Sequence, residues 1–337
     1  MPIATYVEER SFIAESYFVQ ECRKGDRIMK KKMLFIYNPL AGKEQIRDYL
    51  SDIIQTFCKA DFEVTIVATR GPGEATELVA TTGERYDYVV CSGGDGTMNE
   101  VAAGVMRLQN RPVVGYIPAG TVNDFASTLR IPKDMSEAAK LIVGGDLFSC
   151  DLGRFNNRYF TYVAGFGAFT EVSYQTPQDM KNALGKSAYF IEALKHVADI
   201  KPHHMKIEYD DGAIEDEFLL GLVSNTESIS GYKAYSRQEI KMDDGLFEAL
   251  FIRNIQNPLE LQMIINALVT KKLDAEQMCL IRTRHLHIVS DDEVQWTLDG
   301  EEGGWFDEIM IENVYHAMQI VCDLSEVQMV AEQGEEE

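Results

Sequence analysis

A carboxylate set among glycines is the strongest chemical signal in this chain. Residues 93–97 read Gly-Gly-Asp-Gly-Thr, and the apolar run before them, residues 86–91, predicts a buried parallel strand. Residues 97–106 predict the start of a helix, where Thr97 and Glu100 have the spacing of a capping box. Glycines between a strand and a helix N-terminus let the backbone approach an anion. The segment therefore predicts a phosphate-binding loop, and a plain β–α turn is the alternative.

Asp95 is the unusual member of this loop. A carboxylate beside a phosphate is repulsive unless a cation lies between the two groups. Carboxylate oxygens are ligands that Mg²⁺ accepts, either directly or through water. We therefore interpret Asp95 as a magnesium partner, with a solvated surface Asp as the alternative.

Several further elements must position this loop. The first half predicts strands at residues 34–37, 62–68, 86–91 and 112–117. Each strand ends in a glycine-containing loop that leads into a helical pattern, which is typical of a doubly wound parallel sheet. Such a sheet binds ligands at the carboxyl ends of its strands. All four glycine loops are expected at that edge.

The second half has a different pattern. From about Asp151 onward the strand-like runs are shorter and more numerous, at residues 159–164, 205–209, 218–224, 246–252, 286–289 and 294–298. This pattern predicts an antiparallel β-sandwich or barrel, with helices near 183–198 and 257–269. The expected fold is therefore an α/β nucleotide-binding domain followed by an antiparallel β-sandwich domain. The predicted divisions are a leader of unknown role at 1–29, an α/β domain at 30–151 that the segment 310–330 could rejoin, a β-rich domain at 152–309, and an acidic tail at 331–337.

Charge and composition narrow the possible partners. The net charge is −22, from 32 basic and 54 acidic residues among 337, which disfavours nucleic acid. An anionic membrane surface stays possible, since a local basic patch would suffice. No apolar run reaches the roughly 18 to 20 residues of a membrane span. The first 30 residues lack an apolar h-region and carry four glutamates, so they do not resemble a signal peptide. We expect a cytoplasmic protein whose six scattered cysteines are reduced.

Two motifs together carry a family resemblance. Residues 93–100 (GGDGTMNE) and 118–126 (PAGTVNDFA) resemble the catalytic domain of the diacylglycerol and sphingosine kinase superfamily, most closely the soluble bacterial diacylglycerol kinases. The first motif is shared with NAD kinases and phosphofructokinases, and the second separates the family from both. The resemblance runs from about residue 33 to 321. Further matches are Asn38-Pro39-x-x-Gly42, Thr69, Asp151-Leu152-Gly153 and Asp299-Gly300-Glu301.

The resemblance implies that the α/β domain at 30–151 binds ATP and a catalytic magnesium ion, and that the β-rich domain at 152–309 binds the lipid substrate. The implied ATP-site residues are Asn38, Pro39, Leu40, Ala41, Gly42, Thr69, Gly93, Gly94, Asp95, Gly96, Thr97, Met98, Asn99 and Thr121. Asp95, Asp124 and Asp151 would form a carboxylate network around the ion. Phosphoryl transfer needs positioning and charge neutralisation more than covalent help, which suits such a network. The alternatives are a helix-cap role for Asp124 and a strand-end position for Asp151.

Glu301 is the implied general base. In the family, the Glu of the Asp-Gly-Glu motif is proposed to take the proton of the acceptor hydroxyl, a role that a positioned carboxylate can fill. The adjacent Glu302 is the competing candidate, and a hairpin with solvated acids is the structural alternative.

A second, structural magnesium site is also implied by the resemblance. It would use the carboxylate of Asp244 with the carbonyls of Lys241 and Leu246. One carboxylate with carbonyls and waters suits Mg²⁺, which keeps much of its hydration. A simple Asp-Asp-Gly turn is the alternative.

The resemblance implies an ATP-dependent kinase that converts diacylglycerol to phosphatidic acid at the inner membrane face. Alternatives are another lipid acceptor, such as phosphatidylglycerol or a sphingoid base, or a nucleotide- or lipid-binding regulator without activity. Whether the chain forms a homodimer is left open. The segment 181–195 places lysines at helical spacing beside apolar residues, which suits a membrane-docking helix or an ordinary amphipathic one.

Overall fold

The computed structural model describes residues 30–167, 201–225, 241–270 and 275–325. The predicted docking segment 181–195 and the predicted helix 183–198 lie outside these ranges. The described residues from Lys32 onward belong to one compact unit. Among the described residues, no helix is both long enough and apolar enough to cross a membrane.

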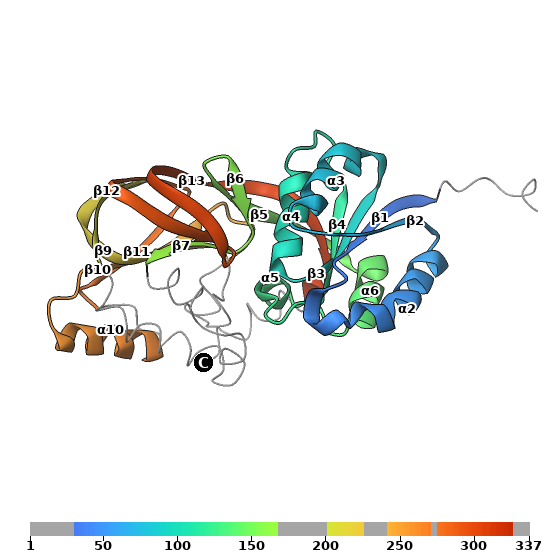
Figure 1. Ribbon diagram of the computed structural model, residues 1–337, viewed down its shortest axis with the longest axis horizontal. Helices are drawn as coiled ribbons and strands as arrows, with labels where there is room; N and C mark the ends of the chain where they lie inside the picture. Colours follow the sequence, from blue (N-terminus) through green and yellow to red (C-terminus); the bar gives the residue numbers. More distant parts are fainter. Residues whose placement is uncertain (1–29, 168–200, 226–240, 271–274, 326–337) are drawn as a thin grey trace, which may run out of the picture. The chain divides into compact units, whose positions relative to one another are not determined.

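The first part of the chain builds a sheet covered by helices on both faces (Figure 1). Its strands are β1 (Lys31–Tyr37), β2 (Phe62–Ala68), β3 (Tyr88–Gly93) and β4 (Val113–Pro118), in the order β4-β3-β1-β2. Its helices are α2 (Ile46–Lys59), α3 (Glu74–Thr82), α4 (Asp95–Val105), α5 (Asp124–Thr128) and α6 (Met135–Gly144), with 3₁₀ turns η1 (Ala41–Glu44) and η2 (Gly83–Arg85). The pairs β1/β3 and β3/β4 are parallel, as predicted.

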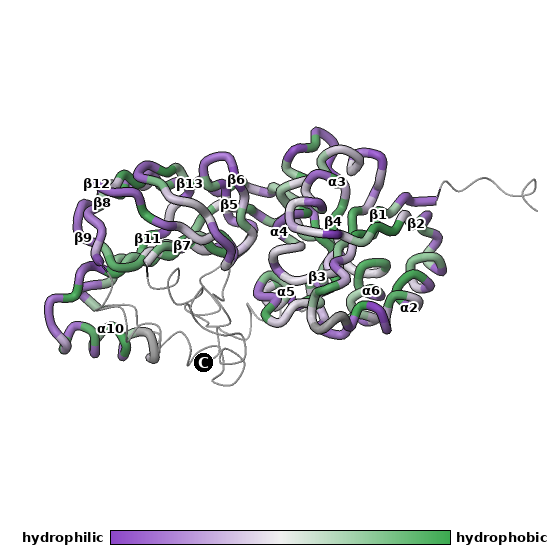
Figure 2. The backbone as a smooth tube through the Cα atoms, viewed as in Figure 1, coloured by the Kyte–Doolittle hydropathy of each residue, from purple (hydrophilic) through white to green (hydrophobic). Residues whose placement is uncertain are grey.

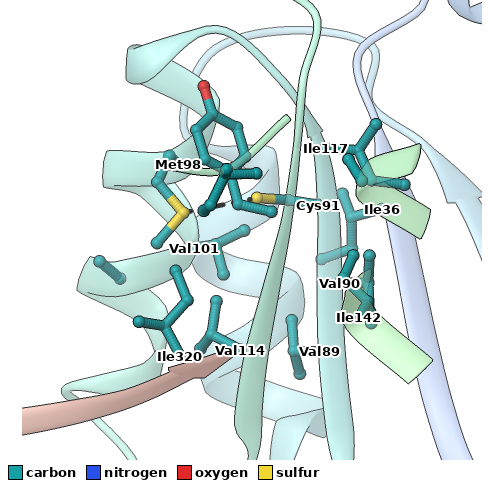
Figure 3. Packing of buried hydrophobic residues seen from close by; sticks show 14 of the residues in the cluster. Ile36, Val89, Val90, Cys91, Met98, Val101, Val114, Ile117, Ile142 and Ile320 are labelled. Carbon is teal, nitrogen blue, oxygen red and sulfur yellow. Dashed lines mark hydrogen bonds between the residues drawn. The ribbon is translucent and has the colours of Figure 1, made fainter. Parts of the chain in front are cut away.

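The two faces of this sheet bury different helices. Met98 and Val101 of α4 pack on one face, while Ile142 of α6 packs on the other (Figure 3). Consecutive residues of β3, Val89 and Val90, are both fully buried, as expected when both faces of a parallel strand are covered. The doubly wound prediction is confirmed.

The second part is an antiparallel β structure, also as predicted. Its elements are β5 (Asp146–Phe155), β6 (Arg158–Phe160), β7 (Val163–Gly167), β8 (His203–Tyr209), β9 (Gly212–Ser224), β10 (Phe247–Arg253), α10 (Pro258–Thr270), β11 (Met278–Thr283), β12 (His285–Leu298) and β13 (Glu301–Cys322). Strand β12 pairs antiparallel with β7, β8 and β13, and β10 pairs antiparallel with β9 and β11. The core is aromatic, with the rings of Phe166 and Trp296 4.9 Å apart. In Figure 2, hydrophobic and hydrophilic residues alternate around α10, which buries Ile264 and Ala267.

Strand β13 is long and serves both parts. It pairs with β12 through its first half and with β5 over much of its length, and Ile320 near its end pairs in parallel with Val114 of β4. Its first residue is Glu301. The strand therefore connects the candidate base directly to the sheet that carries the glycine loops.

Several predicted strand boundaries were wrong. The predicted strand 159–164 is split into β6 and β7, and the predicted strands 286–289 and 294–298 are one strand, β12, with an irregular register between Val289 and Val294. Strands β5, β11 and β13 were not predicted. In β13 the buried positions are interrupted by acidic residues on the exposed side, so the run lacks the continuous apolar pattern of a buried strand.

Candidate functional site

The loops that follow β3 and β4 are joined by backbone hydrogen bonds. The amides of Ala119 and Gly120 donate to the carbonyl of Gly93, at 2.7 and 3.2 Å. Asn123 fixes the second loop, because its Nδ2 donates to the carbonyl of Gly120 at 2.7 Å and its Oδ1 accepts from the Gly120 amide at 3.0 Å. The two sequence motifs therefore form one edge, at the N-terminus of α4, where helix amides can bind an anion.

The predicted capping box was wrong. Helix α4 begins at Asp95, with Gly94 as a cap that lacks a side-chain bond, so Glu100 lies beyond the first turn. Its carboxylate instead accepts the amides of Gly73 and Ala75, at 2.7 and 3.1 Å, at the start of α3. Glu100 thus holds the loop after β2 against α4.

Asp95 lies beside other carboxyl groups. It accepts the amides of Asp124 and Phe125, at 3.2 and 3.4 Å, at the start of α5. Burial, together with the nearby charges of Asp124 and Asp299, raises the pKa of Asp95 to about 7, although the two amide hydrogen bonds lower it. Asp124 itself is buried, with 1% of its surface exposed. Like charges at such distances favour either a bound proton or a cation.

Asp151 does not lie in this group. It occupies the interior of β5, and its two carboxylate oxygens accept the amides of Gly245 and His316, at 2.7 and 2.8 Å. Burial raises the pKa of this carboxyl, and the two amide bonds oppose the rise. The structure thus brings Asp95 and Asp124 together and places Asp151 at the turn that precedes β10.

The sequence reasoning missed the role of Asp299. Leu298 and Glu301 pair across a two-residue hairpin turn, in which Asp299 and Gly300 have φ values of 52° and 80°. The buried Asp299 carboxylate accepts five hydrogen bonds, from the amides of Thr161 (2.7 Å), Tyr162 (2.9 Å) and Val163 (3.0 Å), the hydroxyl of Thr161 (2.9 Å) and Nδ2 of Asn99 (2.6 Å). The Asp-Gly pair signals the hairpin in the sequence, but the distant donors leave no local signal.

Glu301 lies directly over the first turn of α4. A Cβ atom at Gly96 would come within 2.3 Å of Glu301 Oε1, so any other residue at this position would displace the Glu301 carboxylate. Burial raises the pKa of Glu301, and the charges of Glu100 and Asp299 add to that rise, while Arg158 opposes it. A carboxyl whose pKa is raised holds a proton more strongly, which suits a general base.

Glu301 shares a cleft of about 610 Å³ with the glycine loops. The cleft is lined by Asn38, Leu40, Ala41, Gly42, Thr69, Arg70, Gly71, Pro72, Gly94, Gly96, Thr97, Glu100, Gly120, Thr121 and Glu301. Gly42 is required by its φ of 54° and by contact with the Ala119 carbonyl, which a Cβ would approach to 1.7 Å. Most of the predicted ATP residues are therefore gathered around one space.

Five predicted ATP residues, Pro39, Gly93, Asp95, Met98 and Asn99, are not part of this lining. Met98 is fully buried in the apolar core. Asn99 donates its side-chain amide to the Tyr159 carbonyl at 3.0 Å as well as to Asp299. Arg70 and Glu100 line the cleft and were not predicted as ATP-site residues, although Arg70 follows Thr69 and Glu100 is the last residue of the 93–100 motif.

The predicted structural-ion loop is already hydrogen-bonded. Asp244 accepts the amide of Leu246 at 3.0 Å and forms an ion pair with Arg282. The Leu246 carbonyl accepts Nδ2 of Asn313 at 3.1 Å. Within the described ranges, no three His, Cys, Asp or Glu side chains are grouped as metal ligands. Any ion at this loop must compete with a guanidinium group.

Comparisons with protein families match both parts of the chain. Residues 32–155 match the family model described as "Diacylglycerol kinase catalytic domain". Residues 163–322 match the family model described as "YegS C-terminal NAD kinase beta sandwich-like domain".

Named relatives and a solved structure agree with these matches. The chain is 31% identical over 293 residues to a diacylglycerol kinase of Bacillus subtilis (strain 168), covering 86% of this chain and 96% of the relative. It is 37% identical over 279 residues to a diacylglycerol kinase of Staphylococcus aureus (strain MRSA252), covering 82% and 88%. A crystal structure of a diacylglycerol kinase from Bacillus anthracis superposes with a TM-score of 0.75 at 27% identity, covering 90% of this chain and 100% of that chain.

Proposed function

The chain belongs to the diacylglycerol kinase family, and from this premise we propose that it transfers the γ-phosphoryl group of ATP to the free hydroxyl of 1,2-diacylglycerol, giving phosphatidic acid. The observation that carries the proposal is the position of Glu301, against Gly96 in the first turn of α4. A candidate base and a phosphate-binding helix terminus face the same cleft, as a phosphoryl transfer to an alcohol requires.

We assign the acceptor proton to Glu301 and the nucleotide to the glycine loops. The first-turn amides of α4 would bind phosphate oxygens, and the lining residues from Asn38 to Gly42, Thr69 and Thr121 would hold the rest of the nucleotide. Apart from Asp95, the predicted residues that do not line the cleft would support the lining residues; they are Pro39, Gly93, Met98 and Asn99. Domains are proposed as predicted, with ATP bound by 30–151 and 310–330 and lipid bound by 152–309.

Asp95 and Asp124 fit a catalytic Mg²⁺. The two carboxyl groups are close enough for the charge of Asp124 to raise the pKa of Asp95, and a bound cation would relieve this repulsion. Bound there with ATP, Mg²⁺ would neutralise charge on the phosphates. Mg²⁺ commonly uses one or two protein carboxylates and completes its shell with substrate phosphates and water. Asp151 is proposed to support the site indirectly, by holding the 241–246 turn in place. A structural ion at Asp244, Lys241 and Leu246 is also proposed, and it must displace Arg282, which pairs with Asp244.

A kinase acting on diacylglycerol would work at the membrane surface, on the cytoplasmic side if the chain is cytoplasmic as predicted. The sequence-based alternatives keep the same cleft. Phosphatidylglycerol or a sphingoid base could be the acceptor, and an inactive regulator would bind ATP without turnover.

The test is a kinase assay on the full chain with Mg²⁺ and ATP. Mixed micelles would carry diacylglycerol, phosphatidylglycerol or a sphingoid base, with products identified by mass spectrometry. We expect phosphatidic acid, and a loss of about 10²- to 10⁴-fold in kcat for Glu301→Gln. Glu302→Gln is the matched control and should retain activity. Preferential phosphorylation of another lipid, or an active Glu301→Gln enzyme, would contradict the proposal.

A further inference from the structure

The cleft is rich in acid and poor in positive charge. Glu100 and Glu301 line it, and Asp95 lies between the lining residues Gly94 and Gly96. Among the described residues that line the cleft, Arg70 is the one cationic side chain. ATP carries several negative charges, so a protein of net charge −22 gains from a guanidinium at this position.

Arg70 is attached to the cleft by its neighbours. Thr69 donates its amide to the Tyr37 carbonyl at 2.9 Å, which ties the end of β2 to the end of β1. The Arg70 amide then donates to Glu74 Oε2 at 2.6 Å, at the start of α3. The backbone of Arg70 is therefore fixed at the rim, while 88% of its side-chain surface is exposed.

The guanidinium is paired at present with Glu74. Its Nε and Nη2 donate to Glu74 Oε1 at 2.8 and 2.5 Å. A guanidinium has five N–H donors, so this contact leaves several others for a second anion. Exposed ion pairs contribute little stability, whereas arginine binds phosphate in a strong, bidentate and charge-assisted manner. The pair can therefore open at small cost.

We infer that Arg70 binds the phosphate chain of the nucleotide, exchanging Glu74 for phosphate oxygens when ATP enters the cleft. This inference rests on the proposed function for the identity of the ligand. Glu74 does not line the cleft, so its role is to hold the guanidinium at the rim while the cleft is empty. Arg70 is then a nucleotide-binding residue that the glycine motifs do not include.

The chain offers a matched control. Arg107 forms a similar exposed pair with Glu77, at 2.6 Å, and lines the neighbouring open hollow but not the cleft. Three variants follow: Arg70→Ala removes the proposed contact, Glu74→Gln breaks the same ion pair from the other side, and Arg107→Ala breaks the control pair. All three residues belong to surface ion pairs, so the variants should fold. Melting temperatures measured without nucleotide would verify this.

Nucleotide binding would be measured by thermal shift and calorimetry with Mg²⁺ATP, Mg²⁺ADP, AMP and adenosine. We expect Arg70→Ala to weaken Mg²⁺ATP and Mg²⁺ADP about tenfold, the effect of losing one charged contact, with little change for adenosine. Glu74→Gln should bind ATP as well as or better than the wild-type chain, and Arg107→Ala should match the wild type. In the kinase assay, Arg70→Ala should raise KM for ATP more than it lowers kcat.

The outcomes separate this inference from the proposed function. A purely structural ion pair predicts equal effects of Arg70→Ala and Glu74→Gln, and that result would overturn the inference. Unchanged ATP affinity in Arg70→Ala, or no nucleotide binding by the wild-type chain, would also overturn it. A wild-type chain that binds ATP but phosphorylates no lipid would instead remove the proposed function and leave Arg70 as a nucleotide ligand.

Discussion

Asp95 and Asp151 are similar in sequence context but differ in what surrounds them. Both lie close to glycines, and burial raises the pKa of both carboxyl groups. Amide hydrogen bonds oppose the rise at both sites. At Asp95 the charge of Asp124 is the largest influence after burial and raises the pKa, whereas at Asp151 the amide bonds of His316 and Gly245 come next after burial and lower it. The first carboxyl is in a site that favours a cation, and the second is satisfied by the fold.

This difference separates a chemical role from an architectural one. Asp95 lies between Gly94 and Gly96, and these two glycines line the cleft. Asp151 is fully buried, and its bonds tie β5 to the turn at Gly245 and to β13 at His316. Removing each carboxylate should therefore affect different measurements, with turnover lost at Asp95 and stability lost at Asp151.

The largest expected effect is on turnover in Asp95→Asn. The amide keeps the size of the side chain but loses the charge that would bind Mg²⁺, so kcat should fall by several orders of magnitude, while apo stability at pH 8 should not decrease. Steady-state kinetics and thermal unfolding in EDTA would measure both quantities. Activity close to the wild type would remove the metal role of Asp95.

Asp151→Ala should show the reverse pattern. The change leaves the amides of Gly245 and His316 without their acceptor, at a cost of about 1 to 3 kcal/mol for each unsatisfied buried group. Denaturant unfolding should show this loss of stability. Activity per folded molecule, measured at low temperature, should fall far less than in Asp95→Asn. A collapse of kcat in a stable Asp151→Ala protein would return Asp151 to the catalytic group.

The sequence predicts this site where short segments carry the chemistry. The glycine loops at 93–97 and 118–121 and the proposed base Glu301 are local patterns, and the structure places all three around one cleft. The predicted capping box was wrong because α4 begins at Asp95, two residues before Thr97. That shift turns Glu100 away from its own helix terminus and toward α3.

The remaining features depend on contacts between distant residues. Asp299 accepts hydrogen bonds from residues 161–163, and Asp151 accepts one from His316, on a strand far along the chain. The sequence does not distinguish a buried carboxylate that only accepts amide hydrogen bonds from one that also lies near other carboxylates. Strand β13 was missed because acidic residues on its exposed side interrupt the apolar pattern. Its pairing with β12 and with β5 depends on residues far away in the sequence.

A smaller effect concerns stability against pH in metal-free protein. The folded pKa of Asp95 is about 7, above its ordinary value of 3.8. Below about pH 4 both states are protonated and there is no penalty. As the pH rises toward 7, the unfolded chain releases the proton while the folded chain retains it, so stability is lost. The melting temperature of Asp95→Asn minus that of wild type in EDTA should therefore rise across this range and level off above it. A pH-independent difference would contradict the raised pKa.

The smallest expected effect concerns Arg282, which pairs with Asp244 and, at 3.4 Å, with Glu248. Glu248 is 5% exposed, so Arg282→Ala leaves two acidic side chains close together with less compensation. In an Asp95→Asn background, which removes the proposed ligand of the catalytic Mg²⁺, this change should lower the melting temperature in EDTA. Millimolar Mg²⁺ should restore part of the loss, because an ion that binds the folded state stabilises it. Adding Asp244→Ala should abolish the restoration, since the loop then lacks its carboxylate.

The contradicting outcome concerns the Asp95→Asn protein with Arg282 intact. If Mg²⁺ raises its melting temperature as much as that of the Arg282→Ala variant, the ion binds beside the guanidinium, and Arg282 does not replace an ion at this loop.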